Sequence, residues 1–279
     1  MVDLANGEGH IRGGPARRAG APKIFAEEGC RSASSVPLPH TGPAARSSQR
    51  MVPVKTTMLL VDLPLIDYGT ALGIQERIVE RKIGHGGPDV LIMLEHPHTV
   101  SLGKRSSRSD LLTSAGNLTA RGISLHVTDR GGAATYHGPG QVVCYPIVSL
   151  KSHGLRPTEY VRRLEETIIM TLASFGVPAI RQPRLTGVWT DTRDKIASIG
   201  VRIKRGVAYH GFSLNVNLAL DPGELIILCG MPQARMVSLS SFLKRHVDSA
   251  QVRQTIARSF SDVFEVSLEL SGLEHVSEF

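Results

Sequence analysis

The sequence predicts an α/β fold of the α+β type: a single domain over residues 51–279, in which helices pack against a mixed sheet. Strand-like and helix-like runs intermix along this region without the strict alternation that a purely parallel sheet requires. Two of the strand-like runs flank a short Lys-Arg-Gly turn and indicate a hairpin, so part of the sheet is antiparallel. The composition, 41% hydrophobic but only 5% aromatic, supplies a mostly aliphatic core.

Residues 1–50 differ in composition from everything that follows. They are rich in Gly, Ala, Pro, Ser and Arg and hold few large aliphatic side chains. Such a segment cannot bury enough surface to offset the entropy of ordering it, so we expect a disordered extension. Its acidic residues and many glycines argue against a transit peptide, although Arg and Ser are present. Met51 opens the regular region, which suggests that translation begins there.

The first half of the regular region contains three predicted elements. Residues 57–63 are predicted as a strand, and residues 68–83 as a helix with one apolar and one polar face. Residues 89–94, which are continuously apolar after Asp89, predict a strand buried on both sides.

The second half contains two further helices and the hairpin. A helix is expected after Pro157, with Thr158 as its cap, apolar residues at helical spacing and Gly176 at its end. Residues 195–203 and 207–216 form the hairpin. Asp248 or Ser249 is expected to cap a last helix that carries Val252, Ile256, Phe260 and Phe264.

A glycine-rich segment, residues 130–141, separates the strand-like runs 123–128 and 141–148. Its four glycines and one proline would be very unfavourable inside a helix or a central strand. The backbone here can instead approach a ligand closely and offer N–H groups with no Cβ in the way. The polar side chains around this backbone are those of Arg130, Thr135, Tyr136, His137 and Gln141.

Charge and cysteine content narrow the class of protein. The net charge of +7 is spread along the chain, which argues against nucleic acid as a partner. Lys104-Arg105, residues 202–205 and Lys244-Arg245 are candidate patches for an acidic partner, or simply solvated faces. Apolar runs fall short of the roughly 20 residues that span a bilayer, so no membrane is expected. The three cysteines are widely spaced, without a C-x-x-C pair or an apolar signal segment, so we expect a cytoplasmic location.

Cys229 is the candidate nucleophile. It follows the apolar run 225–228 and precedes Gly230, so we expect it where a strand breaks. Considered alone, a cysteine beside four aliphatic residues is more simply a small buried hydrophobe, and Lys195 alone is more simply a solvated charge. Cys144 lies in the middle of an apolar run and is expected to have a packing role.

Three ordered motifs change these interpretations. RGGAATYHGPGQVVCYPI (130–147), KIASIGVRIKRGVAYHGFSLNV (195–216) and the Cys-Gly pair 229–230 together resemble the lipoyl/octanoyl transferase family, over about residues 57–264. The resemblance implies the catalytic fold of biotin and lipoate protein ligases. It also implies transfer of an octanoyl group from acyl carrier protein to a lysine of apo lipoyl-domain proteins, namely 2-oxoacid dehydrogenase E2 subunits and the glycine cleavage H protein.

The resemblance also implies roles for individual residues. Cys229 would carry the octanoyl group as a thioester, and Lys195 would lie beside it, lower the thiol pKa and shuttle protons. His137 would orient the thioester or polarise its carbonyl, with a base role as second choice. Leu228 stands where the family usually has proline, and Ala133-Ala134 where many relatives have a larger or polar residue. The implied substrate-binding residues are Arg130, Gly131, Gly132, Ala133, Ala134, Thr135, Tyr136, His137, Ser198, Ile199, Gly200, Gly211, Phe212 and Ser213.

The implied chemistry needs no ATP and no metal, because a thioester is converted to an amide. Glu95, His96 and His98 are close in sequence but lack the helical spacing of zinc-binding histidines, so no metal site is predicted. Three alternatives remain open: an ATP-dependent lipoate or biotin ligase, an enzyme that transfers between two lipoyl-domain proteins, and a non-catalytic protein that binds acyl carrier protein.

Overall fold

The computed structural model describes residues 55–191, 194–219, 222–228, 231 and 234–278. The chain divides into two units, Met1–Met51 and Val52–Phe279, and the described residues all belong to the second. The expected disorder of residues 1–50 and the start at Met51 therefore lie outside the described residues and stay predictions. The same holds for the position of Cys229.

The central element is a mixed sheet that has nine strands among the described residues, in the order β12-β1-β2-β6-β10-β9-β8-β7, with β11 beside β9. The β12-β1-β2 and β11-β9 pairs are parallel, whereas every pair from β2 to β7 along this path is antiparallel. The predicted mixed sheet is confirmed. Its strands are β1 (Thr56–Leu65), β2 (Asp89–Glu95), β6 (Gln141–Ser149), β7 (Ile180–Gln182), β8 (Leu185–Trp189), β9 (Asp194–Lys204), β10 (Val207–Asn215), β11 (Arg235–Met236) and β12 (Val266–Leu270).

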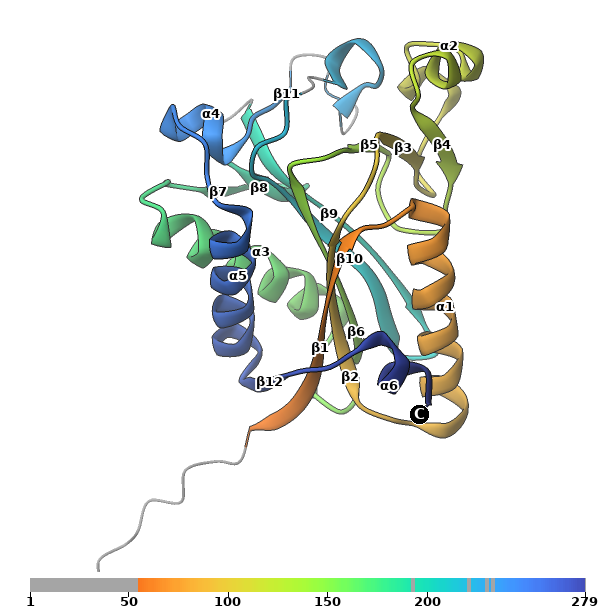
Figure 1. Cartoon of the computed structure of the whole chain (residues 1–279), viewed down its shortest axis with the longest axis vertical. Helices are drawn as coiled ribbons and strands as arrows, with labels where there is room; N and C mark the ends of the chain where they lie inside the picture. The colour runs from red at the N-terminus through yellow and green to blue at the C-terminus, as the bar shows by residue number, and fades with distance from the viewer. Residues whose placement is uncertain (1–54, 192–193, 220–221, 229–230, 232–233, 279) are drawn as a thin grey trace, which may run out of the picture. The chain divides into compact units, whose positions relative to one another are not determined.

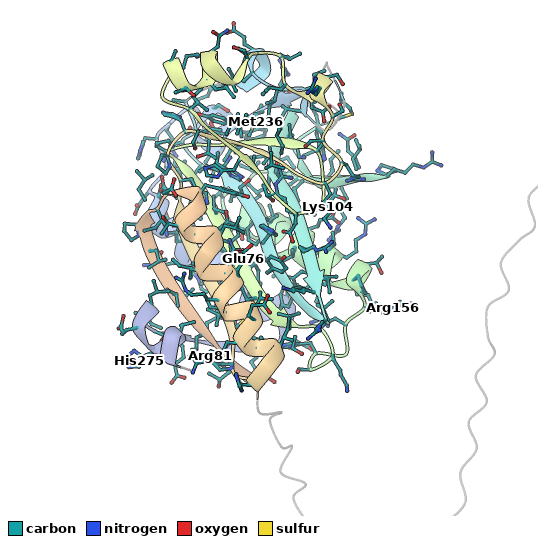
Figure 2. All side chains as sticks on the ribbon, turned by 90° about the vertical axis from the view of Figure 1, so that its right-hand side faces the viewer. Glu76, Arg81, Lys104, Arg156, Met236 and His275 are labelled. Carbon is teal, nitrogen blue, oxygen red and sulfur yellow. The ribbon has the colours of Figure 1, made fainter. Side chains whose placement is uncertain are left out.

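Helices cover both faces of this sheet (Figure 1). On one face lie α1 (Tyr68–His85) and α6 (Leu273–Glu278), and on the other α3 (Pro157–Ser174) and α5 (Ser249–Phe264). Each face of the sheet has its own hydrophobic core, and strand β2 contributes to both. Leu91 and Met93 pack with α3 and α5, whereas the alternate residues Val90, Ile92 and Leu94 pack with α1. Figure 2 looks onto α1, where Glu76 lies on the exposed side of the helix.

A small three-stranded sheet, in the order β4-β3-β5, lies beside the N-terminal end of α1 (Figure 1). It consists of β3 (Thr99–Leu102), β4 (Ser124–Val127) and β5 (Ala134–His137), with η1 (Arg108–Asp110) and α2 (Ala115–Ala120) between β3 and β4. Strand β5 lies inside the glycine-rich segment 130–141, where no strand was predicted. These four residues contain no glycine, and antiparallel pairing with β3 supplies the partner that the local sequence could not reveal.

Two local predictions were wrong. Helix α3 begins at Pro157 with Arg156 at its N-cap, because proline is preset for the first helical position and the Glu159 carboxylate accepts the Arg156 N–H at 2.9 Å. Residues 225–228 do not form a strand: after η2 (Pro222–Glu224), only Ile226 makes a bridge, to Leu111. The predicted Asp248 cap of α5 is confirmed, since its carboxylate accepts the Ala250 N–H at 3.0 Å.

The remaining described helix, α4 (Leu239–Leu243), is short. None of the helices in the described part of the chain is long and apolar enough to cross a bilayer.

Candidate functional site

The predicted binding segments meet around one cavity of about 300 Å³, between the small sheet and the β9-β10 hairpin. Thirteen of the predicted residues line it: Arg130, Gly132, Ala133, Ala134, Thr135, His137, Lys195, Ser198, Ile199, Gly200, Gly211, Phe212 and Ser213. Two predicted residues do not. Tyr136 is fully buried in an apolar cluster beneath β5, and Gly131 lies where the loop crosses β9.

Glycines let three backbone segments pack closely around this cavity. The Gly131 N–H donates to the Val201 carbonyl at 2.9 Å, and a Cβ on Gly200 would lie only 2.9 Å from the Gly131 oxygen. A Cβ on Gly211 would collide with the carbonyl oxygen of Cys144 on the neighbouring strand β6. Gly200 and Gly211 are therefore required by contact between protein backbones, in addition to lining the cavity.

Lys195 is buried, with 3% of its surface exposed, although a lysine after a polar turn is ordinarily solvated. Its ammonium lies 5.3 Å from the centre of the Trp189 ring, and Gly187 leaves room for it: a Cβ there would come within 3.3 Å of Nζ. Lys195 also lines the cavity, from strand β9. Leu228, the residue before Cys229 in sequence, lines the same cavity, whereas Cys229 itself lies outside the described residues.

A chain of buried amides sets the protonation of His137. The Asn215 amide nitrogen donates to the Val237 carbonyl at 2.9 Å, so its oxygen faces Gln141 and accepts from Gln141 Nε2 at 2.8 Å. Gln141 Nε2 also donates to the Tyr136 carbonyl at 3.2 Å, which turns the Gln141 oxygen toward His137 Nδ1, 2.7 Å away. The His137 Nδ1 must therefore carry the hydrogen. Burial holds the pKa of His137 well below its usual value, so the ring is neutral and Nε2 is an acceptor.

Arg130 and Ser101 complete this network. The Arg130 guanidinium donates to Ser101 Oγ from Nη2 at 2.9 Å and from Nε at 3.2 Å, and to the Ser101 carbonyl at 2.6 Å. The serine hydrogen is then left for His137 Nε2, 3.5 Å away. Nε2 is thus already engaged as an acceptor, and the lowered pKa disfavours its protonation, so the neutral ring has no hydrogen at Nε2 to donate to a carbonyl.

Residues 67–261 match the model of the lipoyl protein ligase A/B catalytic domain. The chain belongs to this family. Among similar members of known name, the octanoyltransferase of Syntrophobacter fumaroxidans is 39% identical over 206 residues, covering 74% of this chain and 90% of that protein. The octanoyltransferase of Desulfotalea psychrophila is 41% identical over 207 residues, covering 74% and 93%.

Solved structures confirm the lipoate ligase fold for this family member. The bipartite lipoate protein ligase of Thermoplasma acidophilum superposes with a TM-score of 0.66 at 18% identity, covering 80% of this chain and 91% of that one. A lipoate-protein ligase A bound with ATP superposes equally well, with a TM-score of 0.66 at 18% identity, covering 80% and 93%.

Cys144 has the packing role that was expected. It is fully buried in the core between β6 and α3, and burial raises the pKa of its thiol far above the usual range. The thiolate that nucleophilic attack requires is therefore strongly disfavoured at Cys144.

The residues considered above as metal ligands each contact other groups of the protein. They are Glu95, His96 and His98. His96 Nδ1 donates to the Ile66 carbonyl at 2.6 Å, and its Nε2 accepts from the Tyr145 hydroxyl at 2.7 Å. Glu95 accepts the Gly140 N–H at 2.8 Å, and His98 bonds to the Tyr136 hydroxyl. No group of three or more metal-binding side chains occurs among the residues that the structure describes.

Sequence reasoning missed several residues that line the cavity, among them Tyr68, Val143, Tyr145, Leu185 and His210. For His210 a signal existed, because His210-Gly211 repeats the His137-Gly138 pair. Tyr68 and Tyr145 gave none, since each belongs to an ordinary helical or strand pattern and reaches the cavity only through packing.

Proposed function

We propose that this chain is an octanoyltransferase of protein lipoylation, with residues 51–279 as its catalytic domain. It takes an octanoyl group from acyl carrier protein and delivers it to a lysine of an apo lipoyl domain, through a thioester on Cys229. One observation carries the proposal: segments 130–137, 198–200 and 211–213 meet around a single cavity together with Lys195. Membership of a family whose similar members are named octanoyltransferase supports it.

The first half-reaction loads the enzyme. The Cys229 thiolate attacks the carbonyl carbon of the octanoyl thioester, forming a new C–S bond. The C–S bond to the carrier then breaks, and the carrier thiol leaves with a proton. The Lys195 ammonium favours the thiolate and supplies that proton, and backbone N–H groups of the glycine-rich loops stabilise the oxyanion.

The second half-reaction delivers the group. The lysine amine of the lipoyl domain attacks the octanoyl-Cys229 carbonyl, the C–N bond forms, and the C–S bond to Cys229 breaks. The proton that the attacking amine loses passes to the now neutral Lys195 amine, which restores the starting state. His137 lines the same cavity as a neutral ring and orients the thioester there. Because the thioester is converted to the more stable amide, neither ATP nor a metal enters the balance.

Apolar residues form the slot for the acyl chain. Val143, Ile199, Phe212, Leu185 and Leu228 line the cavity together with the polar groups. Octanoyl-acyl carrier protein and the lipoyl domain would use the same opening in turn, which predicts ping-pong kinetics. We assign the acceptors to the lipoyl domains of 2-oxoacid dehydrogenase E2 subunits and to the glycine cleavage H protein, in the cytoplasm, without nucleic acid or membrane.

An ATP-dependent lipoate ligase is the second candidate, because lipoate protein ligases share this fold. Intact mass spectrometry separates the two. Pure protein mixed with octanoyl-acyl carrier protein, without ATP, should gain one octanoyl group on Cys229 and lose it when apo lipoyl domain is added. Octanoylation of the domain only with free octanoate and ATP would establish the ligase instead. If neither Cys229 nor the lipoyl domain is octanoylated with either acyl source, both the transferase and the ligase are contradicted.

A further inference from the structure

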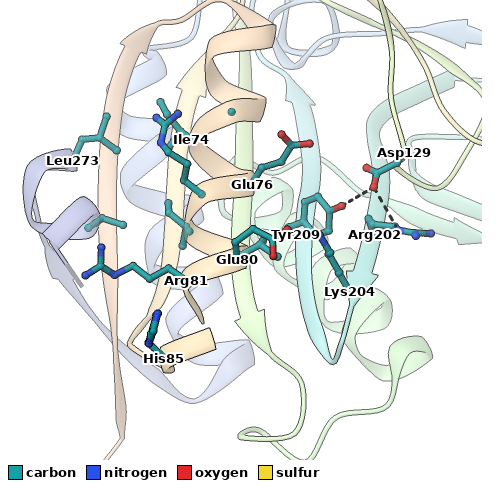
Figure 3. Close-up of a pocket in the computed structure, with 15 residues that line it drawn as sticks. Ile74, Glu76, Glu80, Arg81, His85, Asp129, Arg202, Lys204, Tyr209 and Leu273 are labelled. Atoms are coloured by element: carbon teal, nitrogen blue, oxygen red, sulfur yellow. Dashed lines mark hydrogen bonds and ion pairs between the residues drawn. The ribbon is translucent and has the colours of Figure 1, made fainter. Parts of the chain in front are cut away.

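The cavity described above, in which we place the acyl chain, is called the acyl cavity. A thin wall of protein, the partition, separates it from a second, larger groove. This outer groove, about 1200 Å³, lies between α1, the β9-β10 hairpin and α6 (Figure 3). Asp129 and Tyr209 line the outer groove, whereas the next residues along the chain, Arg130 and His210, line the acyl cavity. The partition therefore consists of two dipeptides, 129–130 from the glycine-rich loop and 209–210 from β10.

The Asp129 carboxylate joins the two sides of the partition. Its Oδ1 accepts from His210 Nε2 at 2.9 Å, its Oδ2 accepts from the Tyr209 hydroxyl at 2.6 Å, and the Arg202 guanidinium lies 3.5 Å away. Figure 3 shows Tyr209 and Arg202 pointing at this carboxylate from the hairpin. The hydrogen bond from His210, with those of its neighbours, holds the pKa of Asp129 well below its usual value, so the group is a carboxylate at neutral pH.

The backbone of β10 departs from regular strand conformation at His210. Successive residues of a strand point to opposite faces, yet the rings of Tyr209 and His210 stack, with centres 4.8 Å apart, and both reach one carboxylate. The cause is the left-handed conformation of His210, whose φ is +54°. Such a conformation is unfavourable for a residue with a Cβ and persists only where the surroundings hold it.

A side chain of α1 and a gap in the pairing with β6 account for the conformation of His210. The buried Gln75 side chain of α1 accepts the His210 N–H at 3.0 Å. On the neighbouring strand β6, Pro146 has no N–H to offer, and the β6-β10 pairing skips residues 209–211 with the same register on either side. His210 therefore leaves the ladder with β6 but stays paired with Val201 of β9, and its ring reaches Asp129.

We propose that Asp129 is a positioning residue for the acyl cavity: its carboxylate ties the loop 129–132 to His210 and so sets the shape of the wall that the acyl chain meets. The inference rests on the proposed function and deepens it. Because Arg130, Gly132, His210 and Gly211 line the cavity, a loop that is no longer tied changes the fit of the chain. Asp129 itself is half-exposed and outside the hydrophobic core, so its loss acts on the cavity more than on the fold.

The test is the acyl-length selectivity of Asp129→Asn. Transfer from hexanoyl-, octanoyl- and decanoyl-acyl carrier protein is measured as kcat and KM for each. We expect kcat/KM for octanoyl to fall roughly tenfold, the loss of one charge-assisted contact, and the octanoyl-to-decanoyl ratio to change about threefold or more. The matched control is Glu166→Gln on α3, whose side chain is 43% exposed against 40% for Asp129 and pairs with Arg181. The control keeps wild-type ratios.

Tyr209→Phe is the second variant, since it removes only the hydroxyl that donates to Asp129 and keeps the ring. It should shift selectivity in the same direction by a smaller factor, even if Asp129→Asn does not fold. Wild-type selectivity in both variants overturns the inference, as does a fall in kcat that is equal for all chain lengths with unchanged KM.

Equilibrium binding of hexanoate, octanoate and decanoate separates this inference from the proposed function, because it needs no transfer. If the wild type transfers nothing but the variants change the relative affinities for these acids, the proposed function fails and the inference stands. If the wild type neither transfers nor binds an acyl group, both fail.

Discussion

Replacing Gln141 by leucine tests the buried network that sets the protonation of His137. Gln141 is fully buried and makes three hydrogen bonds: to the Asn215 oxygen at 2.8 Å, to the Tyr136 carbonyl at 3.2 Å and from His137 Nδ1 at 2.7 Å. Leucine has a similar volume and no polar atoms, so Gln141→Leu leaves these partners unpaired inside the protein.

The size of the effect follows from those contacts. An unsatisfied buried group costs about 1–3 kcal/mol, and two buried side-chain partners are affected, His137 and Asn215. The added apolar surface of leucine returns about 1–2 kcal/mol. We therefore expect the free energy of unfolding to fall by about 3 kcal/mol, with the protein still folded.

Two measurements check this prediction. Urea unfolding gives the free energy, and ¹⁵N NMR of the imidazole reports which nitrogen of His137 carries the hydrogen. In the wild type we expect Nδ1–H, and in Gln141→Leu we expect a mixture or a switch to Nε2–H. The control is Gln182→Leu, because Gln182 is only partly buried and makes one bond, to the Asp191 carbonyl at 3.1 Å; its effect should stay within about 0.5 kcal/mol. A loss below about 1 kcal/mol in Gln141→Leu, with His137 still Nδ1–H, would refute the reasoning.

Three further predictions concern the cavity and its surroundings. Lys195→Ala should raise the pH midpoint of Cys229 alkylation and slow it at pH 7, because the ammonium that favours thiolate is removed; an unchanged rate and midpoint would rule out the dyad. His96 should make stability fall as pH falls from about 6.5 to 4: burial lowers its pKa to about 4, so in this window the unfolded chain binds a proton that the native state does not. Urea unfolding of His96→Gln should show a weaker pH dependence there, and a slope equal to that of the wild type would contradict this. Gly211→Ala should yield little folded protein, because the new Cβ collides with the Cys144 carbonyl; a circular dichroism melt equal to that of the wild type would contradict this.

Elements with a long local pattern could be predicted from the sequence. Helix α5 repeats apolar residues at helical spacing over several turns, and Asp248 caps it as expected. Strand β2 is a continuous apolar run because it is buried on both faces. In both cases the pattern lies within one segment, so no knowledge of distant contacts was needed.

Short or partner-dependent elements could not be predicted in the same way. Strand β5 has only four residues, in a glycine-rich segment, and pairing with β3 makes it a strand. The apolar run 225–228 has the composition of a strand but no partner strand beyond the Ile226 bridge, so its apolar residues pack against the small sheet instead. Composition alone does not distinguish these outcomes, because a strand is stable only when its N–H and C=O groups find partners.

The candidate site likewise has features that follow from local sequence and features that depend on distant contacts. The sequence by itself singled out the segments that meet at the cavity, because the motifs around Arg130, Lys195 and Gly211 are contiguous, and all three line it. Only the tertiary structure decided that Lys195 is buried, which nitrogen of His137 carries its hydrogen, and that Asp129 joins the loop to β10. Each of these depends on groups brought together from distant parts of the chain, as in the contact between Gln141 and Asn215. Burial and hydrogen-bond direction are properties of such encounters, and no local pattern of residues encodes them.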